Sequence, residues 1–106
     1  MSNLGKLRRL YLLVEKIENA FHPTFDEIYD YYYEHGFEIS KRTIQRDIET
    51  LRIEFGIEIT YDRFREGYYV DRSRSLNVNS FFRFLEYANT ADLLSENIRQ
   101  NKNNLE

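Results

Sequence analysis

The sequence predicts a mainly helical domain that carries one small β-hairpin. Apolar side chains recur at helical spacing in three successive segments, and each segment is bounded by residues that favour helix ends. A run of alternating β-branched and aromatic residues follows, and a polar turn separates it from a second short run. The chain has 106 residues, of which 42% are hydrophobic, so it is long enough for one domain with a modest core.

The first predicted helix spans residues 4–20. It ends before Pro23, because proline disfavours helical geometry in the preceding residue, His22. The side chains expected on its apolar stripe are Leu7, Leu10, Tyr11, Val14, Ile17 and Phe21.

The second predicted helix begins after Thr24, whose expected role is that of N-cap in a capping box with Glu27. Gly36 is expected to end it. Its core face is predicted to hold Phe25, Ile28, Tyr32 and His35, with Tyr31 at the edge and Tyr33 exposed. The opposite face is acidic and carries Asp26, Asp30 and Glu34.

The third predicted helix begins after Ser40, as N-cap, and runs to about Phe55, with Gly56 ending it. One stripe is apolar and consists of Ile44, Ile48, Leu51 and Phe55; the opposite side holds Arg42, Gln45, Arg46 and Glu49. Arginine and glutamine suit the recognition of purine edges in a DNA major groove. Asp47 lies about 60° from the apolar stripe, and we expect it to orient a basic side chain of the first helix, such as Arg8 or Arg9.

A hairpin and further helices complete the prediction. Residues 57–61 and 68–70 are the expected strands, and the turn from Asp62 to Gly67 carries Arg63 and Arg65. After a polar link, a helix is expected with Asn79 or Ser80 as its cap, and a last short helix is expected to begin at Thr90. The first of these is apolar all round, which favours burial against a partner chain; its apolar residues are Phe81, Phe82, Phe84, Leu85, Tyr87 and Ala88.

Helix, helix, tight turn, helix and hairpin is the layout of a winged helix-turn-helix, whose third helix enters the major groove. Thr24, Ser40 and Thr43 stand at helix starts, where backbone N–H groups suit a phosphate. Arg42 and Gln45 are the favoured base readers. The full set of predicted DNA contacts is Thr24, Ser40, Lys41, Arg42, Thr43, Gln45, Arg46, Arg63 and Arg65. Lys6, Arg8 and Arg9 are either phosphate contacts or plain surface charge.

The segment from Ser40 to Ile48, with Leu51, resembles the recognition-helix signature of WYL-domain bacterial transcriptional regulators, which have a winged helix of the DeoR type. Glu66-Gly67-Tyr68 resembles their wing, which commonly reads Gly-Gly-Tyr; Glu66 departs from that pattern. The resemblance covers residues 4–72 and implies a DNA-binding domain over 1–72 and a helical dimerisation segment over 73–106. The expected dimerisation residues are Phe81, Phe82, Leu85, Leu93 and Leu94.

The resemblance also implies function. Such regulators bind palindromic operators as homodimers, act mostly as repressors in the cytoplasm at the nucleoid, and carry a WYL domain that senses a ligand. We expect either a shortened form of such a regulator or a small stand-alone relative. A small-molecule or nucleotide effector is expected only if a WYL domain follows.

Several function classes are disfavoured by the sequence. With no cysteine, disulfides and zinc–thiolate sites are excluded, and the two histidines have no companion residues for a metal set. No apolar run approaches the roughly 18 residues of a membrane span. No nucleophile–base pair or phosphate loop is visible. We therefore expect no catalytic residue, no cofactor, no metal and no membrane partner.

The charge pattern leaves one alternative open. The net charge is −3, and the second helix is acidic, which favours a winged helix used only for contact with another protein. However, Lys41, Arg42 and Arg46 are clustered, so a nearly neutral average is compatible with one basic and one acidic face. Our main hypothesis is a sequence-specific regulator that binds double-stranded DNA.

Overall fold

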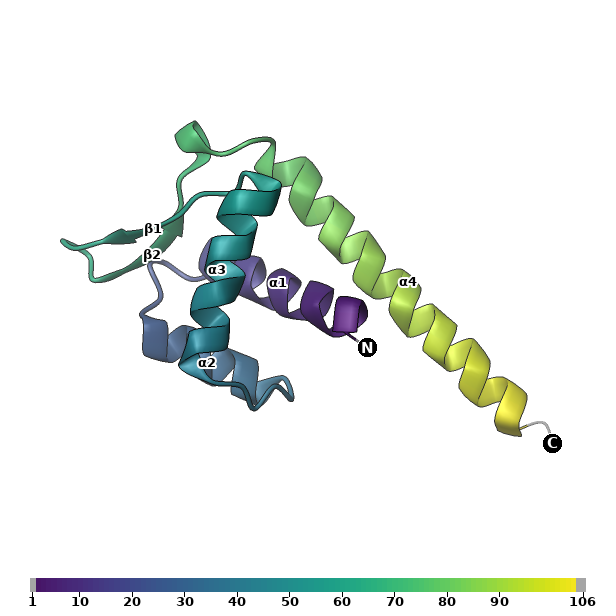
Figure 1. Cartoon of the computed structure of the whole chain (residues 1–106). Coiled ribbons are helices and arrows are strands. Elements are labelled where there is room, and N and C mark those ends of the chain that lie inside the picture. The colour runs from purple at the N-terminus through teal and green to yellow at the C-terminus, as the bar shows by residue number, and fades with distance from the viewer. Residues whose placement is uncertain (1, 105–106) are drawn as a thin grey trace.

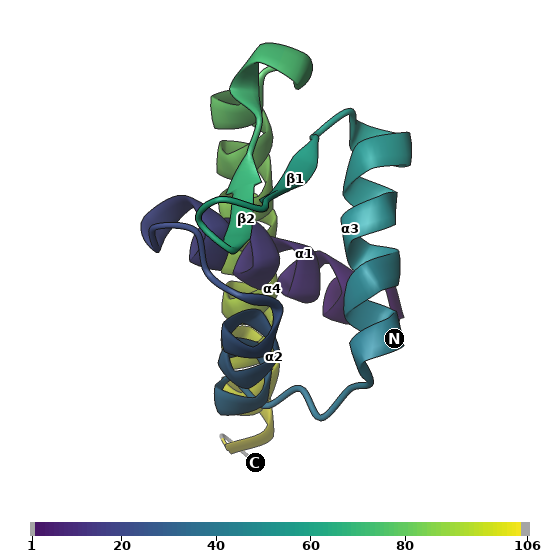
Figure 2. The same cartoon turned by 90° about the vertical axis from the view of Figure 1, so that its left-hand side faces the viewer.

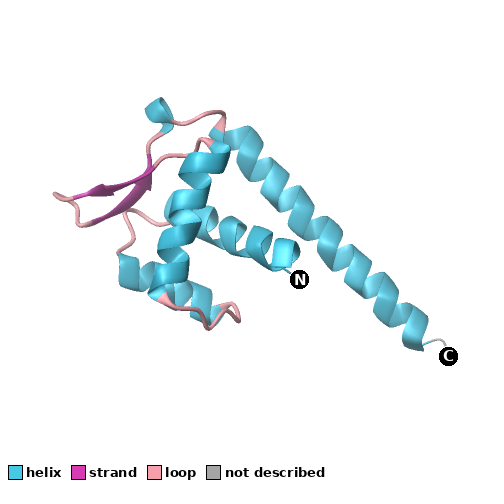
Figure 3. Ribbon diagram, in the orientation of Figure 1, coloured by secondary structure: helices cyan, strands magenta, loops and turns pink. Residues whose placement is uncertain are grey.

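The computed structural model describes the backbone of residues 2–104 and the side chains of residues 5–91. The fold is the predicted one: mainly helical, with a two-stranded antiparallel wing after the third helix (Figures 1 and 3). In chain order the elements are α1 (Ser2–Asn19), α2 (Phe25–Glu34), α3 (Lys41–Phe55), β1 (Ile59–Asp62), β2 (Gly67–Val70), the short 3₁₀ turn η1 (Arg72–Arg74) and α4 (Val78–Asn104).

Helix α1 is the centre of the core and contacts α2, α3, α4 and β2 (Figures 1 and 2). Because several elements cover it, Leu12 and Leu13 are buried in addition to the predicted stripe. Phe21 was expected on that stripe but is 81% exposed. The reason is that α1 ends at Asn19, and the chain turns away through His22, which has a positive φ of 53°.

The predicted caps of α2 and α3 are present. Thr24 and Glu27 form the capping box: the Glu27 N–H donates to Thr24 Oγ1 at 3.1 Å, and the Thr24 N–H donates to Glu27 Oε1 at 2.9 Å. Ser40 Oγ accepts from the Thr43 N–H at 3.2 Å. Gly56 ends α3 in the left-handed conformation, with φ 68°.

Helix α2 packs largely as predicted. Tyr32 is buried, Tyr31 is half-buried, and Tyr33 is 59% exposed. The prediction for His35 was wrong: it is the exposed C-cap of α2, with its Nδ1 lying 2.8 Å from the Tyr31 carbonyl oxygen. Helical periodicity placed His35 on the core face, but the helix ends before that position.

The wing pairs Ile59 with Val70 and Tyr61 with Tyr68. Its first strand begins two residues later than predicted, because the Ile57 N–H bonds to the Leu51 carbonyl at the end of α3 (2.9 Å). The Tyr68 N–H donates to the Pro23 carbonyl at 2.8 Å. The wing is therefore attached to the loop between α1 and α2.

Two predictions for α4 were wrong. Its cap is Asn77, whose Oδ1 accepts from the Ser80 N–H at 3.1 Å, rather than Asn79 or Ser80. The helix also continues past Thr90 to Asn104, and Figure 1 shows its C-terminal half running away from the other elements. Thr90 does not begin a new helix; its hydroxyl donates to the Glu86 carbonyl one turn earlier, at 2.9 Å.

The N-terminal half of α4 belongs to the core of the chain. Leu85, which we predicted to be a dimerisation residue, is fully buried inside the chain and forms no surface seam. Phe82 stacks on Tyr11 of α1, with ring centroids 5.3 Å apart. The ring centroid of Phe81 lies 4.8 Å from that of Phe55. Leu93, Leu94 and Ile98 lie outside the residues whose side chains are described.

Within the described part of the chain, none of the helices combines the length and apolarity that a membrane crossing requires.

Candidate nucleic-acid interface

Helix α3 has one buried face and one solvent-facing face, as predicted. Ile44 and Leu51 are fully buried. Arg42, Gln45 and Arg46 are exposed, and they have no hydrogen-bond or ion-pair partner within the described part of the chain. Figure 2 shows α3 along one side of the molecule. Long polar side chains on this side are therefore available to a ligand. Glu49 is also exposed, and among the described residues no bond joins it to Arg42, Gln45 or Arg46.

Asp47 anchors the other side of α3. It is 1% exposed, and Arg9 of α1 donates to both carboxylate oxygens, from Nε to Oδ2 at 2.9 Å and from Nη2 to Oδ1 at 3.1 Å. The Tyr32 hydroxyl lies within hydrogen-bond distance of Asp47 Oδ2 (3.2 Å) and of the Arg9 carbonyl (2.9 Å). The predicted role of Asp47 is confirmed, with Arg9 as its partner.

The ionisation of this cluster is suited to its role. The hydrogen bond to Asp47 raises the pKa of the Arg9 guanidinium. Burial, followed by the charge of Asp47, raises the pKa of the Tyr32 hydroxyl. Arg9 therefore stays charged and Tyr32 stays a neutral donor. The cluster fixes the rotation of α3 on α1 and so determines which α3 side chains face outward.

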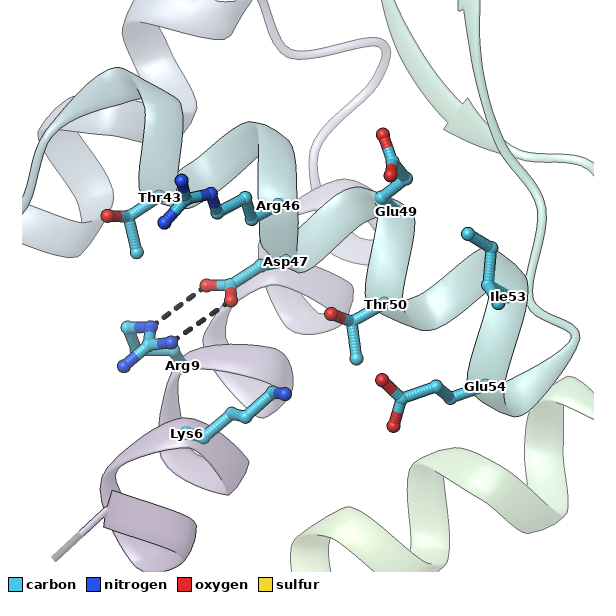
Figure 4. A pocket seen from close by; sticks show the side chains of 9 residues that line it. All are labelled: Lys6, Arg9, Thr43, Arg46, Asp47, Glu49, Thr50, Ile53 and Glu54. Carbon is cyan, nitrogen blue, oxygen red and sulfur yellow. Dashed lines mark hydrogen bonds and ion pairs between the residues drawn. The ribbon is translucent and has the colours of Figure 1, made fainter.

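A groove of about 390 Å³ lies between α1 and α3. Figure 4 shows Arg46 near Thr43 on α3, next to the Arg9–Asp47 pair, with Lys6 on α1 nearby. Its lining residues are Lys6, Arg9, Thr43, Arg46, Asp47, Glu49, Thr50, Ile53 and Glu54. Lys6 and Arg46 form no ion pair with any described residue, so both cations are available to an anion.

A second groove, of about 250 Å³, lies between α3 and the wing. Its lining residues are Gln45, Ile48, Glu49, Arg52, Glu58, Ile59 and Tyr68. Arg52 and Tyr68 were not among the predicted site residues, although Arg52 is two turns after Gln45 on the same helix. Burial raises the pKa of the Tyr68 hydroxyl, which therefore remains a hydrogen-bond donor.

Three predicted contacts at helix starts have other partners. The Thr24 and Ser40 hydroxyls cap α2 and α3, so their contribution to a phosphate site is the exposed N-terminal backbone. Lys41 pairs with Asp26 of α2 at 3.2 Å and lies over the ring of Tyr29 at 5.7 Å. Both charges of that pair are well exposed, so the pair is weak and does not exclude another ligand.

The two arginines predicted to contact DNA from the wing tip differ in their partners. Arg63 is exposed and has no partner in the part of the chain described. Arg65 bonds to Asp62 Oδ2 at 2.9 Å and lies over the ring of Phe21 at 5.8 Å. Phe64, which lies between them and which the sequence analysis did not single out, is 92% exposed.

Arg72 belongs to the fold rather than to this surface. It forms an ion pair with Glu18 of α1 and donates to Asn79 Oδ1 at 3.1 Å. It therefore ties η1 to both α1 and α4.

No known protein family, curated protein or solved structure matches this chain.

Proposed function

We propose that this chain is a sequence-specific regulator that binds double-stranded DNA by inserting α3 into the major groove. The observation that carries the proposal is the pairing of two features on one helix. Arg42, Gln45 and Arg46 are exposed and unpartnered within the described residues, while Asp47 locks the opposite side to α1. A locked helix with free long side chains presents them at fixed positions, which base readout requires.

The proposed contacts divide into two kinds. Arg42 and Gln45 read base edges, since arginine matches guanine and glutamine matches adenine bidentately. Lys6, Arg46, Arg63 and the N-terminal N–H groups of α2 and α3 hold phosphates and set the register. The resemblance of residues 40–51 to the signature of WYL-domain regulators supports DNA binding by this helix, and it favours repression and a cytoplasmic location.

We also propose that the chain binds a palindromic operator as a homodimer, through α4. With Leu85 in the core, the large apolar side chains exposed on the described part of α4 are Phe84 (50%) and Tyr87 (76%). They accompany a shallow groove of about 520 Å³ lined by Arg83, Glu86, Tyr87 and Thr90. Arg83 and Glu86 have opposite charges, so a second copy in antiparallel orientation satisfies both. The two α3 helices would then read half-sites about 34–36 Å apart, or a multiple of it.

One observation favours a second function, a module that binds another protein. Asp26, Asp30 and Glu34 make the exposed side of α2 acidic, Tyr33 is 59% exposed on the same helix, and the chain carries a net charge of −3. Such a surface suits a basic protein partner better than DNA. The two functions differ in their response to salt and to the loss of single cations.

The test is fluorescence anisotropy with labelled duplexes, one random and one recovered from a randomised pool, over a series of salt concentrations. We expect the logarithm of affinity to fall linearly with the logarithm of salt, with a slope near −0.9 for each phosphate neutralised. Arg46→Ala should reduce that slope by about 0.9 for each bound subunit. Arg74→Ala removes the same charge from the exposed η1 turn, outside the proposed contacts, and serves as the matched control, which should leave the slope unchanged. Absence of binding at about 50 mM salt would contradict the proposal.

A further inference from the structure

Phe64 lies at the tip of the wing in a position that folding does not explain. Its side chain is 92% exposed, and no ring of the described residues stacks on it. The nearby exposed ring of Phe21 is covered by the Arg65 guanidinium, 5.8 Å from the ring centroid. Because the Phe64 ring stays in solvent, it adds no hydrophobic stabilisation to the fold. It lies in the turn between β1 and β2, which stands out from the helices (Figure 1), and this position suggests a contact outside the chain.

The turn holds Phe64 outward in a fixed geometry. Asp62 Oδ1 accepts from the Phe64 N–H at 2.9 Å and from the Arg65 N–H at 3.1 Å. Asp62 Oδ2 accepts from the Arg65 guanidinium at 2.9 Å. Because the backbone of the turn is fixed in this way, the turn loses little conformational freedom on binding.

The charges around Phe64 favour a nucleic acid over an apolar protein surface. Arg63 precedes it and has no partner among the described residues, and Arg65 follows it. The Asp62 carboxylate is occupied by the turn and is only 18% exposed. The opposing charge at the tip is Glu66, whose side chain is exposed. A planar ring next to the unpaired Arg63 matches a base step with a neighbouring phosphate.

We propose that Phe64 inserts between two adjacent base pairs in the minor groove next to the major groove that holds α3, while Arg63 contacts a neighbouring phosphate. Apolar side chains inserted in this way partly unstack a base step and bend the duplex. Pyrimidine–purine steps unstack most easily, so the inserted ring would select such a step at a position that no hydrogen bond reads. This inference rests on the proposed function, since it requires a bound duplex.

The experiment uses the duplex recovered from the randomised pool, with the fluorescent adenine analogue 2-aminopurine placed at each flanking step in turn. Its fluorescence rises when it is unstacked. We expect one step of each half-site to brighten on binding of the unmodified chain, and Phe64→Ala to abolish the signal and weaken affinity about tenfold or more. Phe64→Leu, which keeps an apolar side chain able to insert, should retain part of both effects.

Charge variants distinguish insertion from simple electrostatic contact. Phe64→Ala should leave the salt slope unchanged, whereas Arg63→Ala should reduce it by about 0.9 for each bound subunit and leave the fluorescence signal in place. Glu66→Gln should strengthen binding, because it removes the charge that opposes a phosphate. Phe64→Ala should also leave the unfolding midpoint unchanged, since the ring packs on nothing.

The outcomes separate the two proposals. If the unmodified chain binds no duplex, both fail. If it binds with the expected salt slope but no step brightens, or if Phe64→Ala binds as tightly as the unmodified chain, the insertion is wrong and the proposed function stands. If Phe64→Ala weakens binding to a protein partner and leaves DNA binding unaffected, the insertion is also wrong.

Discussion

The guanidinium of Arg9 on α1 donates hydrogen bonds to both carboxylate oxygens of Asp47 on α3, at 2.9 and 3.1 Å, and the two residues are 38 positions apart in the sequence. This contact joins the helix that organises the core to the helix that carries the proposed reading face. It is planar and bidentate, so it fixes orientation as well as distance. The direction in which Arg42 and Gln45 point therefore depends on a residue that touches no ligand.

Replacing Asp47 with Ala should lower the free energy of unfolding by about 2–4 kcal/mol. The substitution leaves the Arg9 guanidinium without its partner, whereas the Tyr32 hydroxyl keeps the Arg9 carbonyl. Arg9 keeps about a fifth of its side chain in solvent, so the loss should fall below that of a fully buried pair. Urea denaturation measures the change. Arg46→Ala, one position away and exposed, should change stability by no more than about 0.5 kcal/mol. Similar small effects from both variants would show that the pair is not an anchor.

Replacing Gly67 with Ala should displace the wing. A Cβ at this position would lie 1.8 Å from the His22 carbonyl oxygen, which is backbone and cannot move alone. We expect a loss of about 2–3 kcal/mol and a shifted amide signal for Tyr68, whose N–H bonds to Pro23. The control is Gly5→Ala, where a Cβ meets nothing within 4 Å, and alanine should stabilise α1 by up to about 1 kcal/mol. An unchanged Tyr68 signal in the Gly67 variant would refute the close approach.

Replacing Glu66 with Gly should stabilise the fold. Glu66 has a φ of 55°, which costs an L-residue about 1–2 kcal/mol and costs glycine nothing. Part of this gain is offset by the greater freedom of glycine in the unfolded chain, so a net increase of up to about 1 kcal/mol is expected from thermal unfolding. Glu66→Ala keeps the same strained backbone and should give no gain. If glycine and alanine behave alike, strain at this position is not significant.

The wing tip should loosen in acid. Hydrogen bonds from the Arg65 N–H and then from its guanidinium hold the pKa of Asp62 below its ordinary value. A group whose pKa is lower in the folded state stabilises that state above its unfolded pKa, and this contribution disappears as pH falls through the folded pKa. The amide signals of Phe64 and Arg65 should therefore be constant near neutral pH and shift only in strong acid. The Ile44 amide, inside the core, is the control for global unfolding. A tip transition at neutral pH would be inconsistent with this assignment.

The sequence predicted those features that depend on neighbours along the chain. The capping box of Thr24 and Glu27, the Ser40 cap and the two faces of α3 all arise from residues within a turn or two of one another. Asp47 was also predicted to brace a basic residue of the first helix, because its angle on the helix left it between core and solvent. The exposure of Arg42, Gln45 and Arg46 follows from the same periodicity.

The remaining features depend on tertiary packing. Leu12 and Leu13 are buried because α1 contacts four elements, and single-face periodicity cannot predict that. Leu85 was assigned to a dimer seam because its helix is apolar all round, but the chain itself covers it. Lys41 and Arg72 are paired with acids 15 and 54 positions away. Phe64 lies in a polar turn, where nothing in the local pattern indicates how far it projects.

The measurement that tests the central claim most directly is the affinity of Arg42→Ala for a set of duplexes in which each base pair of the recovered site is varied in turn. If Arg42 reads a base from a helix fixed by Asp47, the variant should lose about 1–3 kcal/mol of binding free energy on the recovered site. It should lose base discrimination at a single position of the half-site and keep it at all other positions. An equal loss on every duplex would show that Arg42 contacts a phosphate. No loss on any of them would contradict the account of α3 as the reading helix.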